Sequence, residues 1–111
     1  MRTLISNDDG VHARGIHVLN DLLVKRKFNP VIVAPEREQS TTGHSLTLHK
    51  PLRIHKFGSA TFSVSGGPAD CIWLGVKEVL KKKPDLVVSG INRGANLGQD
   101  VFYSGTVSAA R

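Results

Sequence analysis

Residues 1–15 read MRTLISNDDGVHARG. The run 3–5 is β-forming or apolar and stops at the turn residue Asn7, and a helical pattern begins soon afterwards, so the run predicts a short strand. Asp8 and Asp9 therefore lie where a strand gives way to a loop. In an α/β protein, the edge outside the carboxyl ends of the strands is where ligands bind.

Two neighbouring carboxylates repel each other unless a positive group neutralises them, and a divalent cation does this better than any single side chain. An aspartate-rich turn that caps the next helix is the alternative, and the pair alone favours it. The choice between a cation site and a helix cap depends on which residues follow the other strands at the same edge of the sheet.

Length and composition bound the class of protein. The chain has 111 residues, of which 40% are hydrophobic and 22% charged, which predicts one soluble globular domain over 1–111. Neither a run of membrane-spanning length nor a signal peptide is present in the sequence, so we expect a cytoplasmic protein without membrane association. Cys71 is the only cysteine and lies in an apolar helical pattern, which predicts a buried, inert thiol.

The formal charge of +6 and the pI of about 9.9 favour anionic partners such as phosphates or nucleic acid. The basic runs 25–27 and 81–83 fall at the ends of two predicted helices. Cations complement the helix dipole at that position, so this placement requires no nucleic acid.

The order of patterns predicts an α/β fold. Residues 15–27 carry apolar positions at helical spacing, with Ile16, Leu19, Leu22 and Leu23 as the expected buried stripe. Residues 31–34 predict a strand that is buried on both faces, which completes a right-handed βαβ unit.

The second half of the chain continues this fold. Residues 45–65 alternate and predict an antiparallel hairpin that projects from the parallel core. A helix then begins at Pro68, with Ile72, Val76, Val79 and Leu80 expected in its buried stripe, and residues 85–89 form a third parallel strand. We thus predict a Rossmann-like, three-layer parallel sheet with an antiparallel hairpin excursion. Its core is thin, which indicates a fragment or a structure that a partner completes.

The ends of the three predicted parallel strands bring oxygen ligands to one edge of the sheet: Asp8 and Asp9, then Ser40, then Asn92. Carboxylates, a hydroxyl and an amide suit a hard cation such as Mg²⁺, Mn²⁺ or Ca²⁺, and they disfavour a closed zinc site. As isolated residues, Ser40 and Asn92 are typical of loops and turns, so the metal-site hypothesis depends on their joint placement.

A candidate anion site lies near the same edge. Ser104, Gly105 and Thr106 open a predicted helix, where hydroxyls and free backbone N–H groups bind anions. A cation beside an anion site suggests a phosphate ester as the ligand. The sequence contains no GxxxxGK[ST] motif, and no GxGxxG follows the first strand, so it lacks both the P-loop and the dinucleotide fingerprint.

Several blocks resemble the SurE family of stationary-phase survival proteins. They are NDDG (7–10), VAPEREQSTTGHS (33–45), GGPADC (66–71), SGINRGANLG (89–98) and YSGTVSAA (103–110). The resemblance implies a metal-dependent phosphatase that hydrolyses nucleoside 5′-monophosphates, binds one divalent ion, requires no nucleic acid and forms a homodimer or homotetramer. It also implies that this chain is the N-terminal part of a larger fold, since family members continue past Arg111. The sequence departs from the family pattern at Gly67, where the family usually carries threonine.

The resemblance assigns roles residue by residue. It implies Asp8, Asp9, Ser40 and Asn92 as the metal ligands. It also implies that the phosphate contacts are Asn96, Gly43, Ser104, Gly105 and Thr106.

In the expected mechanism, a metal-bound water attacks phosphorus while Asp8 or Asp9 orients it or takes its proton. The helix start at residues 104–106, together with Arg93, stabilises the charge on the equatorial phosphoryl oxygens, and an aspartyl-phosphate on Asp8 is the competing route. His44 is either the acid for the leaving group or a structural histidine. A non-catalytic nucleotide-binding regulatory module and a basic nucleic-acid binder are the alternative functions.

Overall fold

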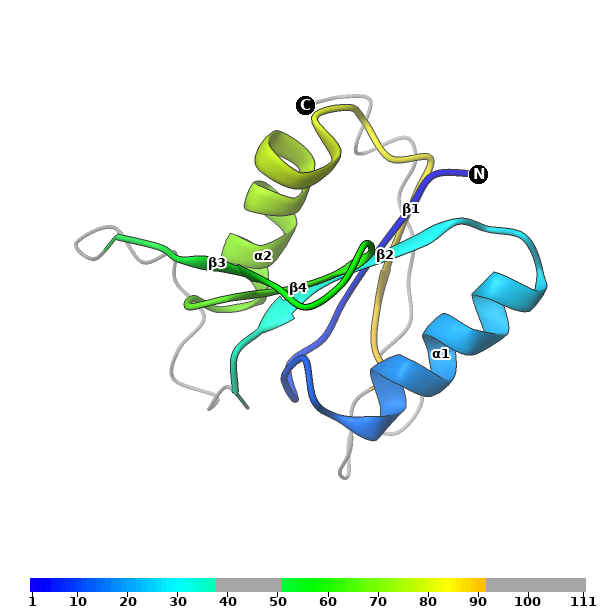
Figure 1. The fold of residues 1–111 in the computed structure, drawn as a ribbon, viewed down its shortest axis with the longest axis horizontal. Helices are drawn as coiled ribbons and strands as arrows, with labels where there is room; N and C mark the ends of the chain where they lie inside the picture. Colours follow the sequence, from blue (N-terminus) through cyan, green and yellow to red (C-terminus); the bar gives the residue numbers. More distant parts are fainter. Residues whose placement is uncertain (38–50, 92–111) are drawn as a thin grey trace.

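The computed structural model describes residues 1–37 and 51–91. Within them, one five-stranded sheet has the strand order β3-β4-β2-β1-β5 (Figure 1). The elements in chain order are β1 (Thr3–Ser6), α1 (Arg14–Lys25), β2 (Pro30–Pro35), β3 (Ile54–Lys56), β4 (Thr61–Val64), α2 (Pro68–Leu74), the π-helix η1 (Gly75–Leu80) and β5 (Leu86–Ser89). The predicted α/β class and the βαβ unit β1-α1-β2 are confirmed.

The sheet is parallel except at one edge. β1 lies between β2 and β5, and Ile5 is opposite both Ile32 and Val88 in the parallel register. β4 continues the parallel part, with Phe62 opposite Val33, and β3 runs antiparallel to β4 at the edge. The carboxyl ends of four neighbouring strands therefore meet at one side of the sheet.

The hairpin is antiparallel as predicted, but it does not project from the core. Its second strand, β4, pairs with β2, so the described sheet has four parallel strands where three were expected. Val64 is fully buried on the face that α2 covers. Alternation in a sequence identifies a strand with two different faces, but it does not identify the partner strand.

Two apolar clusters fill the space between the layers, with α1 on one face of the sheet and α2 on the other (Figure 1). Side chains from successive residues of a strand point to opposite faces. Ile5 accordingly packs in the α1 cluster, whereas Leu4 packs in the α2 cluster. Ile32 and Val33 divide in the same way, so the prediction that β2 is buried on both faces is confirmed.

Helix α1 buries Ile16 and Leu19 as expected, and Leu23 packs against the same cluster. The prediction for Leu22 is wrong, because its side chain is 50% exposed. At about 100° per residue, Leu22 lies roughly 120° around the helix from Ile16, on the flank of the stripe.

The second predicted helix begins at Pro68 as expected, but it widens into η1 after Leu74. Cys71, Leu74 and Gly75 form its buried face. The four residues expected in the buried stripe are only partly buried, and they pack at the margin of this face: Ile72, Val76, Val79 and Leu80.

Candidate functional site at the carboxyl ends of the strands

The turn after β1 carries Asp8 and Asp9, as the sequence predicts. Asn7 closes this turn: its Nδ2 donates to the Gly10 carbonyl at 3.0 Å, and the Gly10 N–H donates to Asn7 Oδ1 at 3.1 Å. Gly10 has φ of 105°, a backbone conformation that favours glycine. Asn7 is completely buried, while Asp8 is exposed and Asp9 is half-buried. The turn thus has a buried anchor and an accessible acidic tip.

The turn is also tied to both neighbouring strands. The Val11 N–H donates to the Pro35 carbonyl of β2 at 2.8 Å, and the Gly90 N–H donates to the Ser6 carbonyl of β1 at 2.9 Å. Val11 is only 1% exposed, so the chain that leaves the turn is part of the core. These bonds fix the acidic turn relative to the exits from β2 and β5.

The exit from β5 crosses the start of α1. A methyl group at Gly15 would overlap the Ile91 carbonyl oxygen, so the two backbones touch at this point. Asp9 and Ile91 line one cavity of about 600 Å³ together with His12, Arg14 and Gly15. The residue that precedes Asn92 in sequence therefore lies at the same cavity as Asp9.

Most of the predicted site falls outside the described residues. Ser40 is the third residue after Arg37, and Asn92 directly follows Ile91. The others outside the described residues are Gly43, His44, Arg93, Asn96, Ser104, Gly105 and Thr106. Within residues 1–37 and 51–91, no group of three or more histidines, cysteines or acidic residues is arranged to hold a metal ion. The four-ligand metal site therefore stays a prediction, of which the structure describes the two aspartates.

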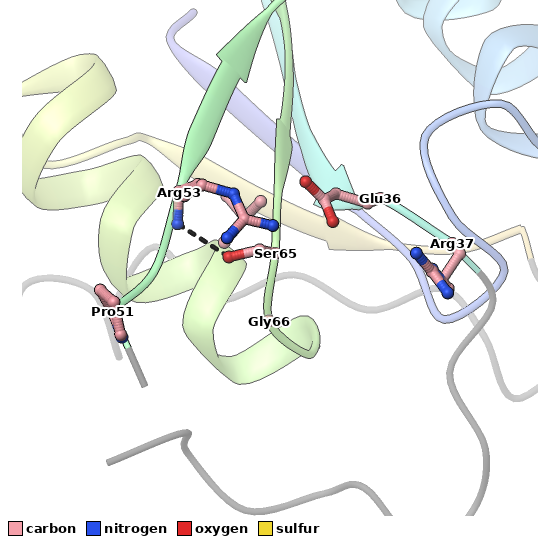
Figure 2. Close-up of a pocket in the computed structure, with 7 residues that line it drawn as sticks. Glu36, Arg37, Pro51, Arg53, Ser65 and Gly66 are labelled. Atoms are coloured by element: carbon pink, nitrogen blue, oxygen red, sulfur yellow. Dashed lines mark hydrogen bonds between the residues drawn. The ribbon is translucent and has the colours of Figure 1, made fainter. Parts of the chain in front are cut away.

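A second cavity, of about 410 Å³, lies over the carboxyl ends of β2 and β4 (Figure 2). Glu36 directly follows β2, and its N–H donates to the Val64 carbonyl of β4 at 2.9 Å. Arg53 and Ser65 are joined twice: the Arg53 N–H donates to Ser65 Oγ at 2.7 Å, and the Ser65 N–H donates to the Arg53 carbonyl at 3.0 Å. Arg37 also lines this cavity.

Cys71 lies on the far side of β1 from α1 and is not part of either cavity. Its thiol is fully buried, and burial raises its pKa from 9.0 to about 12. The neighbouring Ser6 hydroxyl lowers the pKa and Asp70 raises it, both less than burial does. The prediction of an inert, buried thiol is confirmed. Among the helices in the described ranges, none has the length and apolar character needed to cross a membrane.

Sequence reasoning singled out the two aspartates but missed the residues that position them. Asn7 reads as an ordinary turn residue and Gly15 as an ordinary helix start. The signal that was available is the asparagine directly before the acidic pair, with a glycine three residues later, because asparagine side chains bond to nearby backbone groups in turns.

Three comparisons place the chain among known proteins. The sequence profile of the family described as "Survival protein SurE" matches residues 3–111. The chain is 53% identical to the "5'-nucleotidase SurE" of Natranaerobius thermophilus and 58% identical to that of Paramagnetospirillum magneticum. Each alignment covers 99% of this chain but only 46% and 43% of the relatives.

A solved structure agrees with these sequences. The crystal structure of the SurE protein from Aquifex aeolicus is similar with a TM-score of 0.79 at 48% identity, over 88% of this chain and 40% of that one. The chain thus spans less than half the length of the relatives that it matches. From its sequence profile and its sheet alike, the chain belongs to the SurE family.

Proposed function

We propose that the protein is a metal-dependent phosphomonoesterase that hydrolyses nucleoside 5′-monophosphates to nucleoside and phosphate. The observation that carries this proposal is the acidic turn of Asp8 and Asp9, which Asn7 closes at the carboxyl end of β1, an inner strand of the sheet. Family membership and the relatives named 5′-nucleotidase support it.

The proposed metal ligands are Asp8 and Asp9, with Ser40 and Asn92 as the further ligands. The chemistry of this set fits Mg²⁺ or Mn²⁺, with Ca²⁺ as a substitute, because every donor is an oxygen. When bound, one such ion polarises a phosphoryl oxygen and lowers the pKa of a water molecule. The half-exposed position of the turn leaves room for ion and substrate.

The remaining chemistry belongs to the side chains of this chain. Asp9 faces the cavity and is proposed to orient the attacking water and take its proton. Arg14 lines the same cavity and supplies positive charge for the phosphoryl oxygens. Asp8 as a nucleophile is the competing route, and rapid-quench trapping of a labelled acyl phosphate on Asp8 distinguishes the two.

The test is phosphate release from a panel of nucleoside monophosphates with Mg²⁺, Mn²⁺ or a chelator. We expect chelation, Asp9→Asn and Asn92→Ala each to lower the rate by at least ~100-fold, in the range of losses for essential catalytic groups. Asp21→Asn is the matched control, because Asp21 is an exposed carboxylate on α1. Metal-dependent nucleotide binding without phosphate release favours the regulatory module, and release that is indifferent to chelation refutes the metal.

Location and assembly are proposals of the same kind. We infer a homodimer or homotetramer, as the resemblance to the SurE family implies. A cytoplasmic location fits the lone thiol of Cys71, since disulfides are rare in that compartment. Sedimentation of the purified protein tests the first inference, and cell fractionation tests the second.

A further inference from the structure

The cavity over β2 and β4 has its own chemistry. It combines two guanidinium groups, Arg37 and Arg53, with the Glu36 carboxylate and the Ser65 hydroxyl. In Figure 2 the Arg53 side chain and Ser65 lie on one side, Arg37 on the other, and Glu36 between them in this view. Its volume, about 410 Å³, is within the range of small-molecule sites.

The cavity lies beside the acidic turn. Glu36 follows β2, which is the neighbour of β1, and Ser65 follows β4, the next strand along. Neighbouring strands are about 4.8 Å apart, so the cavity begins roughly 5 Å from the end of β1 and extends to about 10 Å. A nucleotide whose phosphate is bound at Asp8 and Asp9 can reach it with its base.

The lining decides which part of a ligand belongs here. A second phosphate would meet the Glu36 carboxylate as well as the two guanidinium groups, so repulsion from Glu36 would offset part of the attraction to Arg37 and Arg53. A group that both donates and accepts hydrogen bonds fits a mixed lining better. Guanine has adjacent N–H donors at N1 and N2 that match a carboxylate, and acceptors at O6 and N7 that match a guanidinium in a bidentate contact.

We propose that this cavity is the base subsite of the enzyme, in which Glu36 and Arg53 select guanine over the other bases. The proposal rests on the nucleotidase function above, because it assumes a phosphate held at the acidic turn. Ser65 acts as a positioning residue, since its hydroxyl holds the Arg53 backbone through the 2.7 Å hydrogen bond.

The kinetic test compares kcat/KM for GMP, AMP, UMP and the base-free ribose 5-phosphate. Glu36→Gln and Arg53→Met should each lower kcat/KM for GMP by roughly 10- to 100-fold, which is the discrimination that a bidentate base contact supplies. The value for ribose 5-phosphate should change less than about twofold, because that substrate makes neither contact. Equal losses on all four substrates would overturn the proposal, as would a loss for GDP and GTP, assayed in parallel, without a loss for GMP.

Two control variants lie away from the cavity. Glu78→Gln removes an exposed carboxylate of η1, and Arg26→Met removes an exposed guanidinium at the far end of α1. Both should leave the ratio of GMP to ribose 5-phosphate hydrolysis at the wild-type value. A change of this ratio in the controls as large as in the cavity variants would also overturn the assignment.

A binding experiment separates this proposal from the proposed function. Guanosine, which carries no phosphate to release, is titrated into wild type, Glu36→Gln and Arg53→Met by calorimetry, with adenosine as the comparison. Weaker guanosine binding in both variants supports the subsite, whether or not any phosphomonoester is hydrolysed. A lack of hydrolysis would refute the nucleotidase function but not the subsite. Equal affinity of wild type and variants for guanosine, or absence of guanosine binding to wild type, refutes the subsite.

Discussion

Replacing Asn7 by alanine should both destabilise the fold and loosen the acidic turn. The substitution removes two hydrogen bonds of 3.0 and 3.1 Å and leaves the Gly10 N–H without this partner, whereas the Gly10 carbonyl keeps the bond that it accepts from the Ala13 N–H at 3.1 Å. Asn7 and Gly10 are both buried, so the unsatisfied Gly10 N–H costs about 1–3 kcal/mol, and the bond lost by the Gly10 carbonyl costs about 1 kcal/mol more. We therefore expect Asn7→Ala to lower the free energy of unfolding by about 2–4 kcal/mol.

Urea denaturation followed by circular dichroism measures this loss. The expected value is a large share of the roughly 5–15 kcal/mol that stabilises a domain of this size. Asn20→Ala is the matched control: Asn20 is a half-buried residue inside α1, and alanine there should change stability by no more than about 0.7 kcal/mol. A loss for Asn7→Ala that equals the control would refute the role assigned to the two bonds.

The aspartate variant separates the two bonds from each other. Asn7→Asp keeps the acceptor for the Gly10 N–H, but an ionised carboxylate cannot donate to the Gly10 carbonyl, and it adds negative charge beside Asp8. Burial and the neighbouring charge should raise the pKa of this carboxyl above its unfolded value. The variant should therefore lose stability, relative to wild type, as the pH rises from about 4, the pKa of an unfolded aspartate, to the raised pKa of the folded state. A pH-independent difference would contradict the geometry.

Three further outcomes are expected. In wild type, Mg²⁺ or Mn²⁺ should raise the melting temperature, and Asp9→Asn should abolish that rise, as thermal denaturation with and without the ion will show. Gly15→Ala should lower kcat by ~10-fold or more, because the added methyl overlaps the Ile91 carbonyl and displaces the exit of β5; unchanged kcat would mean that this exit does not shape the site. Cys71, with its pKa raised from 9.0 to about 12, should resist iodoacetamide at pH 8 until the protein is denatured, and because the folded state holds the proton more tightly, stability should fall between about pH 9 and pH 12.

The local parts of the fold were predictable because their signals are short in range. The apolar run 3–5, the helical spacing that follows and the buried run 31–34 each fit one period, and together they fix the βαβ unit. Pro68 marks a helix start by its own stereochemistry, because it has no N–H to leave unpaired. These predictions required no knowledge of distant partners.

The pairing of β4 with β2 was not predictable in the same way. The hairpin segment has the alternation of a strand with one buried face, and such a strand fits either a separate hairpin or the edge of a larger sheet. The pairing of Phe62 with Val33, which are 29 residues apart in sequence, decides between these two arrangements. Tertiary packing of this kind leaves no periodic signal.

In the candidate site, too, the local features were predictable and the features that depend on strand pairing were not. Asp8 and Asp9 were found because they adjoin the end of a strand. The cavity that joins Glu36 to Arg53 was not found, since it depends on β4 lying beside β2, and this was the missing pairing. Residues on neighbouring strands can be assigned to one site only when the strand order is known.

The strand order also separates two tasks within the proposed enzyme. The acidic turn extends from β1, whose four residues are fully buried between two neighbouring strands, so its position is fixed by the core. The second cavity draws Arg53 from the residues just before β3, the exposed edge strand, whose residues carry little of the core. Substitutions at Arg53 should therefore cost little stability, while those at Asn7 cost much. Base selectivity in this fold can consequently change by substitution at the edge of the sheet without disturbing the groups proposed to act on phosphorus.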